Sequence, residues 1–378
     1  MQYIALPDEK TRRLSFYLAM EEYVARRLNT ADDCFFMWQV KPTVIFGRNQ
    51  LIEAEVNLEF CRKKGIETYR RKSGGGCVYA DMSNVMFSYV TRDEQVNFTF
   101  NRYINMIALM LCKLGVEAKT SGRNDILIKG VNGNERGVKG NEGGVNRRSL
   151  AEGKSKENEG EEGGDWRKVS GNAFYHVPGH SIVHGTMLYD TCMENMVGSI
   201  TPSDEKLVSK GVKSVRQHIA LLKDHIGLSL DEFKAFVRHN LCHDEVMLTQ
   251  DDIADIEEIE REYLSEEFIY GHNPAYTTVR RERIEGVGEL EVRMEVKGNV
   301  IRSLNLVGDY FLVGDLDNAV LKPLRGAALS RESLEKALPE RLDDIILNLQ
   351  REEFIGLILK PLSSPLRREG SEREVKEK

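Results

Sequence analysis

The segment RRKSGGGCVYAD, residues 70–81, places three consecutive glycines one residue after a run of three cationic residues. Because glycine carries no Cβ, the backbone N–H groups of Gly74, Gly75 and Gly76 are open to close approach by an anion. Arg71 and its cationic neighbours add positive charge beside those groups. We therefore predict that a phosphate or a carboxylate binds here, although an unliganded glycine-rich hairpin is an alternative interpretation of the same residues.

A lysine and a histidine further along the chain have the chemistry to complete such a site. Lys168 stands in RKVSGNAF, where a lysine at a strand end can place its charge on a phosphate or on a developing oxyanion. His184, beside a glycine in HGT, is a candidate to line the same site. His176, His180 and His184 recur every four residues, but an intervening Pro-Gly pair interrupts any helix and argues against a zinc site.

Asn124 and Asp125 precede the apolar residues ILI. An amide and a carboxylate at this position suit a magnesium ion or a nucleotide, and they equally suit the cap of a turn. Asp125 is therefore a candidate ligand of Mg²⁺, with the ion held through the nucleotide.

Composition limits the classes of function that these residues can serve. A chain of 378 residues exceeds what one hydrophobic core usually supports, so we expect two domains. The formal net charge of −7 argues against a general nucleic-acid binder. The six cysteines form no C-x-x-C pair, as expected in a reducing compartment. The sequence shows no signal-peptide pattern and no run of about 18 apolar residues, so we expect a cytoplasmic protein without a membrane segment.

Hydrophobic periodicity predicts the elements that position the candidate residues. Leu14, Tyr17, Leu18 and Val24 recur at helical spacing within residues 14–28, and we expect the acids and arginines of that helix on its opposite face. The other elements expected in the first 250 residues are strands at 34–40, 43–49, 66–71 and 77–91, a strand-turn-strand unit at 166–190, and helices at 54–65, 100–115 and 228–241. Strands and helices without strict alternation favour an α+β fold with a mixed or mostly antiparallel sheet.

Two further segments differ from this domain. Residues 131–165 contain no aromatic residue and many Gly, Asn and Glu, so we predict a disordered low-complexity insertion in a domain that spans 1–250. An acidic helix then opens a second domain at 251–360. In it we expect a small antiparallel sheet at 277–311, helices at 330–338 and 342–350, and a solvated tail at 361–378.

Five motifs in series, RRKSGGGCVYAD, GRNDILI, RKVSGNAF, HGTMLYD and KGVKSVRQHIALL, resemble the lipoate-protein ligase A family. Downstream, VGDYF with LDNAVLKPLRGAALSRESLEKAL resembles the accessory domain of the two-domain members of that family. The resemblance covers nearly the whole chain apart from the insertion and the tail. It implies an α+β catalytic domain like those of biotin and lipoate ligases, followed by a small α+β accessory domain.

The resemblance also implies an activity. Members of this family activate lipoate with ATP and Mg²⁺ to lipoyl-AMP and then transfer the lipoyl group to one lysine of an acceptor protein. The implied acceptors are the lipoyl domains of 2-oxoacid dehydrogenase E2 subunits and the glycine-cleavage H protein, and we expect a monomer. Lys168 matches the lysine that touches both the lipoyl carbonyl and the α-phosphate. The residues that we predict to contact ATP or the adenylate are Arg71, Gly74, Gly75, Gly76, Cys77, Val78, Tyr79, Asp125, Lys168 and His184.

Two other functions remain open. An ATP-independent octanoyl or lipoyl transferase of the same fold would use a cysteine thioester, with Cys77 or Cys192 as the candidate, although the accessory domain favours the ligase. A lipoate or biotin binder without catalysis would keep the pocket and not need Lys168. The family often has a histidine where this chain has Ala80, so no lipoyl contact is expected from that side chain. Val44 and Val78 are expected to line a tunnel for the lipoyl chain.

Overall fold

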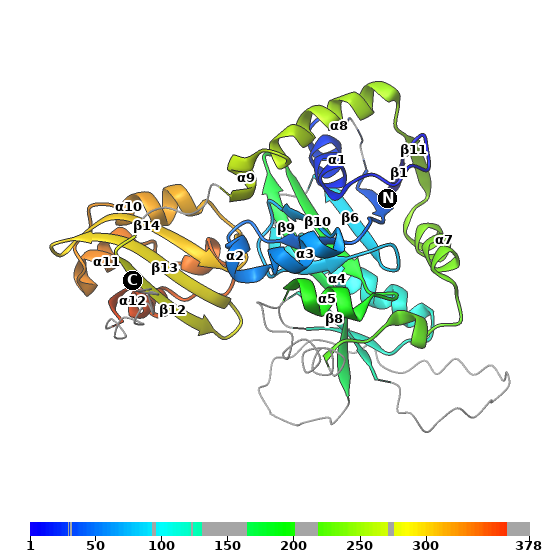
Figure 1. The fold of residues 1–378 in the computed structure, drawn as a ribbon. Helices are drawn as coiled ribbons and strands as arrows, with labels where there is room; N and C mark the ends of the chain where they lie inside the picture. Colours follow the sequence, from blue (N-terminus) through cyan, green and yellow to red (C-terminus); the bar gives the residue numbers. More distant parts are fainter. Residues whose placement is uncertain are drawn as a thin grey trace, which may run out of the picture.

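The computed structural model describes residues 1–28, 30, 32–92, 96–121, 124–130, 165–200, 218–270 and 276–360. Figure 1 shows two bodies, a larger one that carries a long mixed sheet and a smaller one formed by the C-terminal residues. Helices flank the sheets in both, so the predicted α+β class is confirmed.

The large sheet has eight strands and is mixed. Strand β1 pairs in parallel with both of its neighbours, whereas every other pairing in the sheet is antiparallel. In spatial order the strands are β11 (Asp244–Met247), β1 (Gln2–Ala5), β2 (Cys34–Trp38), β6 (Val85–Thr91), β10 (His180–Met187), β9 (Trp166–Val177), β8 (Asp125–Lys129) and β7 (Ala118–Thr120).

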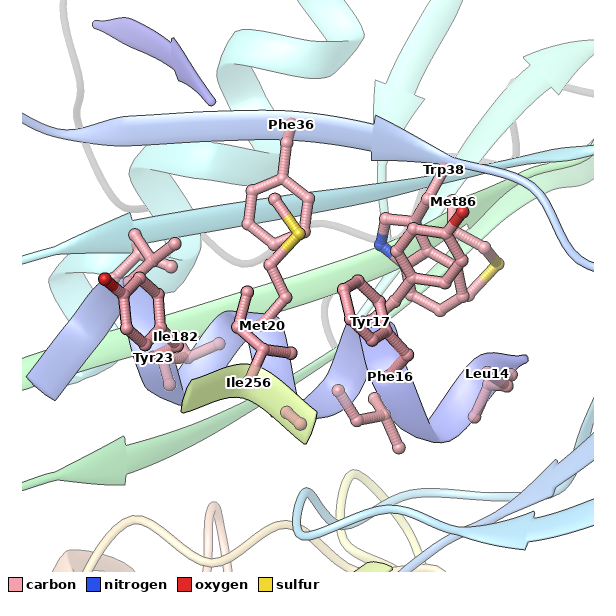
Figure 2. Close-up of a cluster of buried hydrophobic side chains, with 14 of the residues drawn as sticks. Leu14, Phe16, Tyr17, Met20, Tyr23, Phe36, Trp38, Met86, Ile182 and Ile256 are labelled. Atoms are coloured by element: carbon pink, nitrogen blue, oxygen red, sulfur yellow. The ribbon is translucent and has the colours of Figure 1, made fainter. Parts of the chain in front are cut away.

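Helices cover both faces of this sheet. Helices α1 (Leu14–Arg26) and α8 (Gln250–Tyr263) share one hydrophobic core, and α4 (Val96–Lys113) and α7 (Leu230–Leu241) share the other. Because strand side chains alternate between faces, Met86 and Val90 of β6 point to the α1 core while Phe87 lies in the α4 core. Figure 2 shows the first core, where aromatic side chains of α1 meet Phe36 and Trp38 of β2.

Helix α1 departs from the sequence-based prediction in one respect. Its acids were expected on the solvent face, but Glu21 and Glu22 are only 0% and 1% exposed. Hydropathy assigns any glutamate to the surface, whereas here partners from distant segments satisfy both carboxylates.

A second, three-stranded sheet carries the glycine motif. Strand β3 (Thr43–Phe46) lies between β4 (Glu67–Arg70), which runs parallel to it, and β5 (Val78–Ala80), which runs antiparallel. Residues 71–77 connect the two outer strands, so the glycines form the loop between them. Helix α3 (Leu58–Lys64) ends at Gly65 with φ of 65°, as the sequence predicts. The short helices α2 (Ile52–Glu55) and α5 (Met193–Ile200) contribute to the core of this sheet.

The C-terminal body has its own core beneath an antiparallel sheet of β12 (Thr278–Ile284), β13 (Gly288–Lys297) and β14 (Val300–Gly308). The helix predicted at 342–350 is wrong. Leu342–Asp344 form one 3₁₀ turn, Asn348 has φ of 64°, and α12 (Arg351–Leu359) begins only at the Gln350 capping box. The other helical elements here are the π-helical turn Asp317–Leu321, α10 (Lys322–Leu324) and α11 (Arg331–Ala337).

Helix α8 packs on α1, and its Ile253, Ile256 and Tyr263 belong to the core of the large sheet. The following helix, α9 (Glu266–Tyr270), also contacts the larger body through β4. We therefore propose that the domains divide after Tyr270 rather than after residue 250.

Two predictions fall outside the described residues, namely the disordered insertion, of which only Asp165 is described, and the tail at 361–378. The ends of the insertion are nevertheless close together, because the backbone N–H of Gly130 donates to the carbonyl of Asp165 at 2.6 Å. Within the described ranges, no helix is long and apolar enough to cross a membrane.

Candidate active site

A cavity lies where the glycine loop of the small sheet meets strands β9 and β10 of the large one. Its free volume is about 90 Å³. Trp38 on β2 and Lys168 on β9 lie on its wall, and two strands separate their own strands in the sheet. At the usual strand spacing these two strands are about 14 Å apart, so the two residues are at least that far from each other across the sheet. The cavity therefore has an apolar end near Trp38 and a cationic end near Lys168.

The structure brings most of the predicted site residues together on this wall. They are Arg71, Gly75, Gly76, Cys77, Val78, Lys168 and His184. The side chains of Tyr79 and Val44 lie instead in a separate core of the small sheet, where they are 2% and 0% exposed, so the tunnel role expected for Val44 is wrong. Gly74 packs against the C-terminal body, and Asp125 reaches the site through its contact with Lys168.

Arg71 is buried under the glycine loop and organises it. Its Nη2 donates to the carbonyls of Gly74 at 2.6 Å and Gly76 at 2.7 Å, and its Nε donates to Ser73 Oγ at 2.9 Å. Burial lowers the pKa of the Arg71 guanidinium to about 10. Among the described residues no carboxylate contacts this guanidinium directly, so its charge is available at the cavity wall.

The neighbouring cations serve other segments. Arg70 donates to the carbonyls of Arg48, Gln50 and Ile269, which ties the loop to the preceding turn and to α9. Lys72 forms ion pairs with Glu22 and Glu262, each at 2.7 Å. Of the three cations in the motif, only Arg71 lines the cavity.

The C-terminal body closes one side of the cavity. Phe311 lies on the cavity wall and stacks on Phe174 of β9 with ring centroids 5.6 Å apart. The backbone N–H of Gly75 donates to the carbonyl of Tyr310 at 3.2 Å. A Cβ on Gly74 would lie 2.3 Å from that same carbonyl oxygen, so the close approach of the two bodies requires glycine there.

Lys168 reaches the cavity beside a β-bulge between β8 and β9. Its Nζ lies 2.7 Å from Asp125 Oδ1, and both side chains are partly exposed. A Cβ on Gly171 would lie 2.8 Å from the Lys168 ammonium, so this glycine leaves room for the lysine to lie along the wall. Bulges commonly re-aim a side chain beside an active site.

Sequence reasoning missed three residues that shape this site. Glu21 contacts His184, Ser73 contacts both His184 and Arg71, and Phe311 closes the wall. One signal for Glu21 was available, because it stands four residues after Tyr17 and three before Val24, within the apolar stripe of α1. For Phe311 no local signal exists, since its position depends on how the two bodies pack.

Residues 14–241 match the family described as lipoyl protein ligase A/B catalytic domain, and residues 273–358 match the one described as bacterial lipoate protein ligase C-terminus. The chain belongs to the lipoate-protein ligase family. Its relatives include lipoate-protein ligase 1 of Staphylococcus aureus, which is 30% identical over 353 residues. Lipoate-protein ligase LplJ of Bacillus subtilis is 28% identical over 353 residues. Each alignment covers 90% of this chain and 95% of the relative.

Solved structures share the fold of this ligase-family chain. The Plasmodium falciparum protein LipL1 in complex with lipoate aligns with a TM-score of 0.64 at 20% identity, covering 95% of this chain and 99% of that one. A bipartite lipoate protein ligase of Thermoplasma acidophilum, described with its E2 lipoyl domain, aligns with a TM-score of 0.56 at 24% identity, covering 74% and 100%. A lipoate-protein ligase A bound with ATP aligns with a TM-score of 0.50 at 22% identity, covering 71% and 97%.

A wider groove, of about 980 Å³, lies between the N-terminal segment and α7. None of the predicted site residues lines it. The smaller cavity is the better candidate for the site of this ligase-family chain, because the glycine loop, a buried guanidinium and a lysine converge there.

Proposed function

We propose that this protein joins lipoate to a lysine of an acceptor protein in two ATP-dependent half-reactions. The observation that carries the proposal is that Lys168, Arg71 and the glycine loop line one cavity together with apolar Trp38 and Met86. A carboxylic acid with an apolar tail matches that polarity, and membership of the ligase family supports lipoate as the acid.

In the first half-reaction an oxygen of the lipoate carboxylate attacks the α-phosphorus of ATP. The new P–O bond forms as the bond to the β-phosphate oxygen breaks, and pyrophosphate leaves. Two anions must approach each other in this step, so Arg71 and Lys168 lower its barrier by offsetting the accumulating negative charge. The backbone of Gly76, where a Cβ would have open space, lets the mixed anhydride lie close to the loop.

Mg²⁺ would neutralise charge on the nucleotide phosphates. Asp125 would hold it, because its carboxylate is the one beside Lys168. Within the described ranges no group of three or more His, Cys, Asp or Glu side chains could hold a metal ion. A single carboxylate, that of Asp125, fits an ion whose other ligands are phosphate oxygens and water.

In the second half-reaction the neutral acceptor amine attacks the lipoyl carbonyl, AMP leaves with the C–O bond electrons, and the nitrogen loses a proton to solvent. The protein need only position the two groups. We propose the lipoyl domains of 2-oxoacid dehydrogenase E2 subunits or the glycine-cleavage H protein as acceptors. The Thermoplasma ligase described with its E2 lipoyl domain supports the first of these.

The cysteine transferase is the competing function, and the environment of Cys77 opposes it. Burial raises the pKa of the Cys77 thiol to about 12, so very little nucleophilic thiolate exists near neutral pH. Cys192 is exposed but does not line the cavity.

The test is lipoate-dependent exchange of labelled pyrophosphate into ATP, without an acceptor protein, for the wild type and for Lys168→Ala. Exchange in the wild type and its loss in the variant would support the ligase. A folded wild type that shows no exchange, but accepts a lipoyl or octanoyl group from a carrier without ATP, would establish the transferase instead.

A further inference from the structure

Glu21 is a buried carboxylate in the middle of the large domain. It stands in the apolar stripe of α1, is 0% exposed and does not line the cavity. Burial of a carboxylate is costly unless hydrogen bonds compensate for the lost water. The partners of Glu21 are therefore informative.

The first partner leads to the glycine loop. Glu21 Oε2 lies 2.8 Å from His184 Nδ1, and His184 Nε2 lies 2.7 Å from Ser73 Oγ. Ser73 Oγ in turn accepts from Arg71 Nε at 2.9 Å. Because Arg71 also holds the loop carbonyls, a continuous hydrogen-bonded chain runs from Glu21 to the glycines.

The donors fix the direction of this chain. Arg71 only donates, and a carboxylate only accepts. The Ser73 hydroxyl therefore accepts from Arg71 and donates its single proton to His184 Nε2, while His184 Nδ1–H donates to Glu21. With the His184 proton on Nδ1, every donor in this chain has an acceptor.

The second partner leads to the apolar end of the cavity. Ser88 Oγ donates to Glu21 Oε1 at 2.6 Å, and Ser88 Oγ accepts from Trp38 Nε1 at 2.9 Å. Trp38 lines the cavity and stacks on Tyr17 of α1. The indole is thus held on one face by stacking and at its N–H by the hydrogen bond to Ser88, which in turn donates to Glu21.

We propose that Glu21 is a positioning residue that sets both ends of the site, the loop through His184, Ser73 and Arg71, and the wall at Trp38 through Ser88. The inference rests on the proposed function for its kinetic consequences. Glu21→Gln keeps one acceptor oxygen but replaces the other with an amide donor, so the His184 and Ser88 donors would compete for a single acceptor in a buried place, which would loosen both groups.

The carboxylate–imidazole–hydroxyl order of Glu21, His184 and Ser73 also occurs in serine hydrolases. Two observations separate this arrangement from theirs. Ser73 is 1% exposed and does not line the cavity, and its oxygen already accepts a bond from Arg71. The hydroxyl therefore orients its neighbours and does not act as a nucleophile.

The test compares Glu21→Gln with Glu260→Gln in pyrophosphate exchange. Glu260 is an equally buried glutamate, 3% exposed, whose partners are Ser15 and Arg13 at the packing of α8 on α1. We expect Glu21→Gln to lower kcat and to raise the KM for lipoate, each by about tenfold or more, as expected for an unsatisfied buried partner. Glu260→Gln should lower the Tm and leave both kinetic constants unchanged.

The two branches can be separated by single variants. Ser73→Ala should lower kcat alone, and Ser88→Ala should raise the KM for lipoate alone. Adding Ser73→Ala to Glu21→Gln should cost little further kcat, because both interrupt one chain. Additive losses, or wild-type kinetics in Glu21→Gln, would overturn the proposal. If Glu21→Gln does not fold, the two serine variants decide instead: Ser73→Ala must lower kcat alone and Ser88→Ala must raise the KM for lipoate alone.

A spectroscopic readout keeps this test separate from that of the proposed function. The chain has two tryptophans, so Trp166→Phe leaves Trp38 as the only one. In that background Glu21→Gln should shift the Trp38 emission and Glu260→Gln should not. If the wild type shows no exchange, the proposed function fails, and this emission alone decides whether Glu21 positions Trp38. An unchanged spectrum would refute the branch through Ser88.

Discussion

Arg71→Met should nearly abolish pyrophosphate exchange while changing global stability little. Methionine keeps much of the volume but leaves the carbonyls of Gly74 and Gly76, which now accept at 2.6 and 2.7 Å, without their donor. At about 1–3 kcal/mol for each unsatisfied buried carbonyl, the loss is about 2–6 kcal/mol. Burial of the guanidinium opposes this, because the lowering of its pKa to about 10 corresponds to about 3 kcal/mol.

The two effects are similar in size, so the unfolding free energy should change by an amount between a gain of about 1 kcal/mol and a loss of about 3 kcal/mol. Urea denaturation measures that change and exchange measures activity. Arg48→Met is the matched control, since Arg48 is exposed on the adjacent turn and does not line this cavity. A loss above about 5 kcal/mol would show that Arg71 is chiefly structural. Near-normal exchange in the variant would refute its role in organising the loop.

Three further outcomes are expected. Asp125→Ala should raise the KM for Mg-ATP yet change stability by less than about 1 kcal/mol in thermal unfolding, because its pair with Lys168 is partly exposed. The raised Cys77 pKa means that the folded state keeps a proton that the unfolded chain loses above its ordinary pKa of about 8.5. The free energy of unfolding should therefore fall as pH rises from about 9 to 12, and less so in Cys77→Ala when urea denaturation is compared at pH 8 and pH 10. Deleting Gly133 to Gly163 should leave the KM for ATP in the exchange assay unchanged, because Gly130 and Asp165 are already paired, and a large rise would show that the insertion takes part in nucleotide binding.

The sequence predicted what depends on local pattern. The strand expected within residues 77–91 includes β6, helical spacing placed the apolar residues of α1 correctly, and Gly65 ends α3 as expected. The glycine motif, Lys168 and His184 proved to share one cavity wall. These signals are readable because each is set by residues close together in the chain.

What the sequence did not predict depends on contacts between distant segments. Glu21 lies 163 residues from His184, and neither residue shows alone that the other satisfies it. The helix expected at 342–350 failed for a similar reason. Residues 342, 346 and 349 are buried in the core of the C-terminal body, but they are held there by one 3₁₀ turn and a left-handed Asn348. Their apolar pattern indicates that these residues are buried, but it does not distinguish a helix from an irregular buried segment.

The three glycines of the loop differ in why a side chain would or would not fit at each position. Gly74 is required by the Tyr310 carbonyl, and Gly75 by its φ of 85° and the nearby Phe311 ring, whereas a Cβ on Gly76 would meet nothing within 4 Å. The bare backbone that suggested an anion site thus also receives the C-terminal body. An anion that takes the Gly75 N–H must displace the Tyr310 carbonyl from it, in a cavity whose free volume is only about 90 Å³. An anion that binds through the Gly75 N–H would therefore be linked to docking of the C-terminal body, and each would weaken the other by the same free energy.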